Sequence, residues 1–151
     1  MHPILIECLN AGVLTGSRAF NCHKSDSDWD IVLTKSAIPK SLDNISYNIC
    51  ASYQTNDEPS DADGIDNLGE MYDGTIWGPI LSILKYYIDD TDDTDDTVIN
   101  LFVYPDSELN IVRKFTQVNA RMMFSLTQQE REHKPTRVTK FKEILEDLNI
   151  T

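Results

Sequence analysis

The 151-residue sequence has few basic residues, few cysteines and no long apolar run. No apolar segment reaches the length of about 20 residues that a membrane-spanning helix needs. The N-terminal segment also lacks the basic region and the cleavage site of a signal peptide. These absences predict a cytoplasmic protein without a membrane anchor.

Only three cysteines are present, Cys8, Cys22 and Cys50, and they have no paired spacing. An odd number of such cysteines predicts free thiols in a reducing compartment rather than a disulfide framework. The three histidines lie far apart in the sequence and form no cluster with the cysteines. A structural zinc site is therefore not expected.

Basic residues are few compared with acidic ones. Thirteen Lys and Arg residues stand against 25 Asp and Glu residues, which gives a formal net charge of −12 at pH 7. A chain of this charge repels phosphate backbones, so extended binding of DNA or RNA is not expected. A single nucleotide remains compatible with it, because a bound divalent cation reverses the local potential. A basic protein partner also remains compatible.

The length and an apolar fraction of 40% predict one globular domain over residues 1–151. Hydrophobic periodicity predicts strands at 13–15, 28–34, 45–53 and 98–104. It predicts helices at 4–10, 75–88, from Ser107 to about 126, and 138–148, with the Lys134-Pro135 pair as an interruption before the last one. The acidic segments 54–73 and 89–97, the second an Asp-Asp-Thr repeat, are predicted to be loops. The order predicts an α+β fold, a small mixed β-sheet with helices packed on it.

One stretch carries a chemical pattern. Gly16-Ser17 is followed, after ten residues, by Asp28-Trp29-Asp30. On a strand, Asp28 and Asp30 point to one face and Trp29 to the other. Two adjacent carboxylates repel each other unless a positive charge lies between them, and Mg²⁺ is the usual partner. A Gly-Ser turn offers a phosphate exposed N–H groups and a hydroxyl.

Gly16, Ser17, Asp28 and Asp30 match the signature Gly-Ser-x10-Asp-x-Asp position for position. In this the chain resembles the nucleotidyltransferases of the DNA polymerase β superfamily, most closely the minimal, single-domain members. The resemblance covers residues 12–34. The chain also looks like short nucleotidyltransferase-like proteins of bacteriophages, and a phage origin would imply the host cytoplasm.

The resemblance implies a mechanism and a set of partners. Gly16 and Ser17 would hold the triphosphate of an NTP, and Asp28 and Asp30 would bind Mg²⁺ in a two-ion site. A nucleoside monophosphate would pass to a hydroxyl of a protein or RNA acceptor, and a separate protein partner is expected. Arg18 follows Ser17 and is placed to reach a phosphate oxygen, although a solvent-exposed loop arginine is an equal alternative.

The resemblance also implies a third carboxylate on a neighbouring apolar strand. The position of that character in strand 98–104 is Asn100. An amide can coordinate a metal through its oxygen but cannot accept a proton as a carboxylate does. Asp57, Glu58 and Asp106 are less well placed substitutes. An alternative function is therefore a catalytically degenerate relative that acts as an acidic binding or inhibitory protein, such as a phage-encoded inhibitor of a host enzyme.

Overall fold

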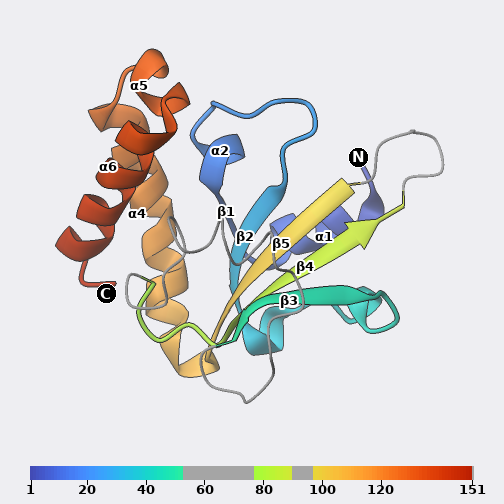
Figure 1. Ribbon diagram of the computed structural model, residues 1–151. Helices are drawn as coiled ribbons and strands as arrows, with labels where there is room; N and C mark the ends of the chain where they lie inside the picture. The colour runs from blue at the N-terminus through green and yellow to red at the C-terminus, as the bar shows by residue number, and fades with distance from the viewer. Residues whose placement is uncertain (53–76, 90–96, 151) are drawn as a thin grey trace.

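The computed structural model describes residues 1–52, 77–89 and 97–150, with the side chains of 51 and 52 excepted. Five strands form one mixed sheet in the order β1-β2-β5-β4-β3, with helices on both of its faces (Figure 1). The strands are β1 (Val13–Thr15), β2 (Trp29–Thr34), β3 (Tyr47–Ser52), β4 (Ser82–Ile88) and β5 (Thr97–Tyr104). The helices are α1 (Pro3–Ala11), α2 (Gly16–Ala19), α4 (Leu109–Ser125), α5 (Gln128–Glu132) and α6 (Lys134–Asp147), with short 3-10 turns at Lys35–Ala37, Lys40–Leu42 and Asp106–Glu108. The predicted α+β class is confirmed.

The centre of the sheet is a parallel pair. Strand β2 runs parallel to β5, whereas the pairs β1–β2, β5–β4 and β4–β3 are antiparallel. A parallel pair needs a long crossover between its strands. Here everything from the end of β2 to the start of β5 forms that crossover, and it includes β3 and β4.

Both faces of the sheet are covered at β2, so its apolar residues Ile31, Val32 and Leu33 are all fully buried. Ile31 and Leu33 pack with Leu5 and Cys8 of α1 on one face, and Val32 packs with the α4 and α6 side chains on the other. Burial beneath α1, with a smaller effect of the Glu7 charge, raises the pKa of the Cys8 thiol to about 11.

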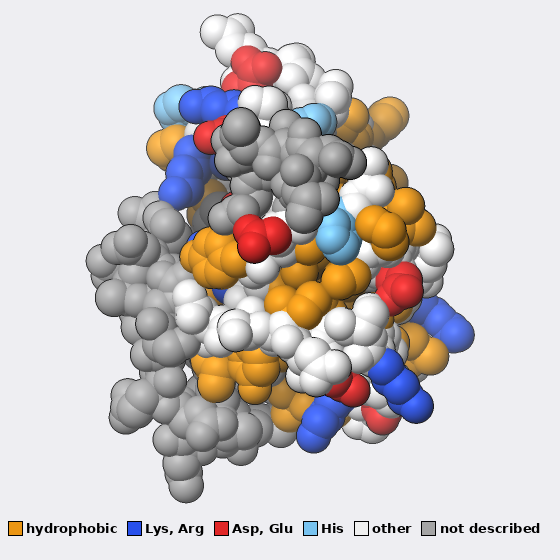
Figure 2. Space-filling model, turned by 90° about the vertical axis from the view of Figure 1, so that its right-hand side faces the viewer, with side chains coloured by type: hydrophobic (Ala, Val, Ile, Leu, Met, Phe, Trp, Pro, Cys, Tyr) orange, Lys and Arg blue, Asp and Glu red, His pale blue; other side chains and the backbone are white. Residues whose placement is uncertain are grey.

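Apolar side chains also lie on the surface, on the side of the molecule near the N-terminus (Figure 2).

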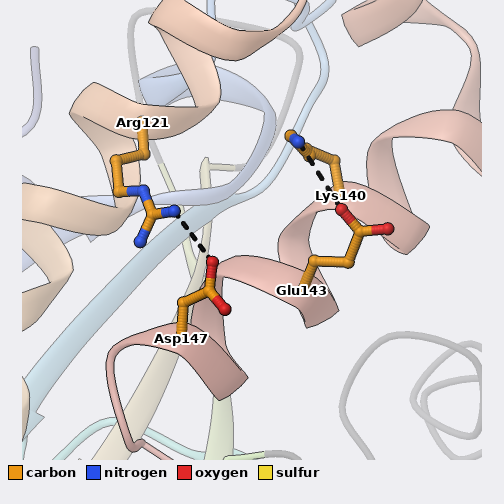
Figure 3. A network of polar contacts seen from close by, with 4 residues as sticks. All are labelled: Arg121, Lys140, Glu143 and Asp147. Atoms are coloured by element: carbon orange, nitrogen blue, oxygen red, sulfur yellow. Dashed lines mark hydrogen bonds and ion pairs between the residues drawn. The ribbon is translucent and has the colours of Figure 1, made fainter.

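Helix α4 buries a stripe of apolar side chains, Ile111, Phe115, Val118 and Met122, and α6 packs beside it. Figure 3 shows one exposed link between them, in which Arg121 of α4 lies 2.9 Å from the Asp147 carboxylate of α6. Within α6, Lys140 lies 3.5 Å from Glu143. Such exposed pairs contribute little to stability, so apolar contact holds the two helices together. None of the described helices is long and apolar enough to span a bilayer.

The predicted interruption at Lys134-Pro135 is wrong, because α6 begins at Lys134 and holds Pro135 in its first turn. That position needs no N–H hydrogen bond, so proline fits there. The acidic segment 54–73 lies outside the described residues. Of segment 89–97, only the two end residues are described, and the last of them begins β5.

The predicted helix over 75–88 is also wrong, since its second half is strand β4. Gly78 has a left-handed φ of +70°, and Leu81 N–H already donates to Val103 of β5. In β4 Ile83 faces one core and Tyr86 the other. A strand buried on both faces has apolar residues on both, which can imitate helical spacing.

The larger hydrophobic core, called the main core below, lies between the sheet and helices α4 and α6 and contains an aromatic stack. The Trp77 ring stacks on Phe102 and Phe115, with centroids 4.8 and 5.3 Å apart. The Tyr104 hydroxyl donates to the Trp77 carbonyl oxygen over 2.7 Å in a fully buried bond. This bond joins the end of β5 to the segment that leads into β4.

Tyr104→Phe removes the hydroxyl that donates to the Trp77 carbonyl oxygen. We expect the free energy of unfolding to fall by about 1–2 kcal/mol, the usual effect of deleting one side of a buried hydrogen bond. Denaturant unfolding measures it. Tyr47→Phe, at a ring that is 50% exposed, is the matched control and should change stability by less than about 0.5 kcal/mol. Equal effects of the two substitutions would contradict the structural role of the Tyr104 bond.

Candidate functional site

A row of polar residues crosses four neighbouring strands. Thr15 of β1 pairs with Asp30 of β2, Asp30 with Asn100 of β5, and Asn100 with Lys85 of β4. Directly paired residues share a face of the sheet. The next row on that face, Val32, Phe102 and Ile83, lies in the main core. The polar row therefore lies where the core beneath α4 and α6 ends.

The two carboxylates of the motif meet at Asn100. Its Nδ2 donates to Asp28 Oδ2 over 3.0 Å and to Asp30 Oδ1 over 2.9 Å. Asp28 lies just before β2, and its side chain is 35% exposed, whereas Asp30 is only 7% exposed. The amide of Asn100 thus holds one open and one buried carboxylate together. The structure brings Asn100 to the two aspartates, as predicted.

Lys85 is a site residue that sequence reasoning missed. Its Nζ lies 3.8 Å from Asp28 Oδ2, and its side chain is only 20% exposed. Because the segment was predicted to be a helix, the alternation that puts Lys85 on the face of Asn100 was not considered. Its position between apolar and aromatic neighbours in the sequence was the signal that could have revealed it.

The Gly16 turn presses against the second carboxylate. Gly16 is buried with φ +71°, and a Cβ added there would collide with Asp30 Oδ2. Only glycine allows both the left-handed backbone and this close approach. Ser17 follows in the first turn of α2, and no described residue hydrogen-bonds its hydroxyl. The predicted turn and the predicted carboxylates are therefore neighbours in space.

Arg18 holds the loop that carries Asp28. Its Nε and Nη2 donate to the Ser27 carbonyl oxygen over 3.1 and 2.8 Å, and Nη2 also reaches Ser25 at 3.3 Å. The guanidinium lies 4.0 Å from the centroid of the Trp29 ring. Burial lowers the pKa of Arg18, and the charges of nearby aspartates, Asp28 first, partly offset this. Its observed contacts are to this loop and ring.

Asn119 is a second residue that the sequence did not reveal. From α4 its Nδ2 donates to the Leu14 carbonyl oxygen over 2.6 Å, and its Oδ1 accepts from the Thr15 hydroxyl over 3.1 Å. These bonds fix β1 immediately before the Gly16 turn. A polar residue on the inner side of an amphipathic helix was the available signal.

The substitutes for a third acid do not join the site. Asp57 and Glu58 lie outside the described residues. Asp106 lies beyond the far end of β5, where its carboxylate accepts from the Ser36 backbone N–H over 2.9 Å. That bond is the main reason why the pKa of Asp106 is lowered. Asp106 acts as an anchor for the loop after β2.

The donor set can be tested against a metal ion. Among the described residues, no group of three or more His, Cys, Asp or Glu side chains is placed to hold one. Asp28 and Asp30 nevertheless offer the hard oxygen ligands that Mg²⁺ prefers. Asn100 Oδ1 is buried and has no hydrogen-bond partner in the described part of the chain. Turning this amide would present a third oxygen, so the residues fit a single small oxygen-seeking ion.

Gly16→Ala tests how tightly the turn and the carboxylate are packed. The added Cβ forces a left-handed φ on alanine and collides with Asp30, so the free energy of unfolding should fall by about 2 kcal/mol or more. Ser17→Ala, one residue along, is the control and should cost less than about 0.5 kcal/mol. Thermal and denaturant unfolding measure both. Equal stability of the two variants would contradict the close approach of Gly16 to Asp30.

Comparisons with known proteins found no matching family model, no matching curated protein and no matching solved structure.

Proposed function

We propose that the protein is a Mg²⁺-dependent nucleotidyltransferase that moves a nucleoside monophosphate from an NTP to a hydroxyl of a protein or RNA acceptor. The hydroxyl oxygen would form a bond to the α-phosphorus, and the bond to the β-phosphate would break and release pyrophosphate. One observation carries the proposal: the Asp28 and Asp30 carboxylates meet at Asn100 while the Gly16 turn lies against Asp30. A phosphate cradle and an oxygen-rich cation site thus share one small region. The resemblance of the Gly-Ser-x10-Asp-x-Asp spacing to polymerase β-like enzymes supports the same assignment.

In this function each side chain has a distinct part. Gly16 and Ser17 offer backbone N–H groups and a hydroxyl to the phosphates. Asp28 and Asp30 hold Mg²⁺, which when bound neutralises charge on the reacting phosphate. Arg18 fixes the loop before β2 and so sets the position of Asp28.

The proton of the acceptor hydroxyl needs a destination. Asn100 cannot take it, because an amide is not a base at neutral pH. Asp28 is the more exposed of the two aspartates, so an acceptor reaches it more readily than Asp30. We assign the proton to Asp28 or to solvent, which implies slow transfer. We also propose that a separate protein partner presents the acceptor, in the cytoplasm.

A second candidate is a non-enzymatic acidic protein that keeps the fold and the site. Specific contacts favour it: Asn100 satisfies both carboxylates with neutral hydrogen bonds, and Lys85 adds a positive charge beside Asp28. Because these contacts compensate the two carboxylates within the protein, the site needs no bound metal ion to be stable. The net charge of −12 would then favour binding to a basic protein surface.

Incubation with Mg²⁺ and each α-labelled NTP, with and without cell lysate, separates the two candidates. The enzyme should label an acceptor, and Asp28→Ala/Asp30→Ala should reduce labelling by at least 100-fold, the order expected when charge stabilisation is lost. Lys40→Met, at an exposed lysine of the Lys40–Leu42 turn, is the control and should label normally. If no acceptor is labelled and no NTP shifts the melting temperature, the nucleotidyltransferase proposal fails.

Asn100→Asp tests whether the missing base limits transfer. A carboxylate at this place in β5 can accept the hydroxyl proton, and general-base catalysis contributes about 10²–10⁴-fold. We therefore expect labelling to rise by at least tenfold. Asn100→Leu, which removes the polar group, is the comparison and should not raise it. Unchanged labelling in Asn100→Asp would show that position 100 is not where a third acid acts.

A further inference from the structure

We propose that this site, without a bound nucleotide, takes one divalent ion rather than two, and that Lys85 supplies the fixed positive charge at Asp28 that a second ion would otherwise supply. The proposal rests on the proposed function, because it concerns the same two aspartates. It departs from the two-ion site that the resemblance implies. It also assigns a role to a residue that no motif includes.

The position of Lys85 is built into the sheet. Lys85 pairs with Asn100 in the β4–β5 register, and Asn100 pairs with Asp30 in the β5–β2 register. Three neighbouring strands therefore direct these side chains to one face. The Lys85 ammonium lies 3.8 Å from Asp28 Oδ2, and its side chain is four-fifths buried. A lysine held in this way is not a freely moving surface charge.

The charges then limit what the site can bind. Two aspartates with Lys85 and Arg18, whose guanidinium interacts electrostatically with both of them, leave a formal charge of about zero before a nucleotide binds. Three carboxylates with Arg18 and no lysine would leave about −2. One divalent ion brings the present site to about +2, but two would bring it to about +4 beside a nearly buried Asp30, and the two ions would repel each other. While no nucleotide is bound, the second ion is therefore the one that Lys85 excludes.

Asn100 completes the ligand set for the first ion. Its Nδ2 now bridges the two carboxylates, and its buried Oδ1 has no partner among the described residues. Turning the amide by 180° would exchange these two atoms, and one buried amide atom would remain unpaired in either orientation. The turn therefore gives an ion a third oxygen without adding a new unpaired group.

Mn²⁺ titration followed by electron paramagnetic resonance counts the bound ions directly. A chain with 25 acidic residues binds ions elsewhere, so the count of Asp28→Asn/Asp30→Asn is subtracted from that of the wild type. We expect a difference of one ion. Lys85→Met should tighten this ion about tenfold, and Lys85→Met/Asn100→Asp should raise the difference to two.

Two controls separate the local charge from the overall charge. Lys40→Met makes the same change in net charge on an exposed turn and should leave the affinity unchanged. Lys85→Arg keeps the charge and should also leave it unchanged, and Lys85→Gln replaces Lys85→Met if that variant does not fold.

A difference of two ions in the wild type would overturn the proposal and leave the proposed function standing. An effect of Lys85→Met no larger than that of Lys40→Met would do the same. A difference of zero would overturn both, because Asp28 and Asp30 would then bind no metal.

Discussion

The parallel pairing of β2 with β5 is the constraint on which the site depends. It puts Asn100 beside Asp30 although 70 residues separate them in the chain. A parallel pair requires a long crossover, and this crossover also supplies β4, which brings Lys85 to the other side of Asn100. The β2–β5 and β4–β5 registers thus place Asp30, Asn100 and Lys85 side by side. A shift of one residue between β2 and β5 would turn Asn100 toward the opposite core.

That register also explains how two aspartates tolerate each other. Asp30 is nearly buried, and an uncompensated charge there would be costly. The Asn100 amide gives each carboxylate a donor, and the Lys85 ammonium adds a positive charge 3.8 Å from Asp28 Oδ2. The Gly16 backbone lies close to Asp30 Oδ2. Asp30 is therefore held apart from bulk water, whereas Asp28 remains accessible.

The sequence predicted the parts of the fold that have clear periodicity. Strand β2 and the stripe of α4 carry one dominant pattern, so their prediction was confirmed. It also placed Asn100 on the right strand, beside the motif. Strand β4 failed because Ile80, Ile83, Leu84 and Tyr87 also fit helical spacing, and such spacing alone does not distinguish a helix from a strand that carries apolar residues on both faces. Lys85 was missed for the same reason, because the face on which a residue lies depends on the secondary structure predicted for its segment. Asn119 was missed because its partners, Leu14 and Thr15, lie more than 100 residues away.

Binding and transfer make different demands on position 100. Holding a divalent ion requires an oxygen ligand, and asparagine provides one, whereas accepting a proton requires a base, and asparagine does not. Under the proposed function, an amide in place of the base therefore lowers the rate of transfer more than the affinity for the ion. Lys85 acts differently, because its positive charge beside Asp28 weakens the binding of a divalent ion. In that function, Asn100 thus limits turnover, whereas Lys85 limits how many ions the two aspartates hold.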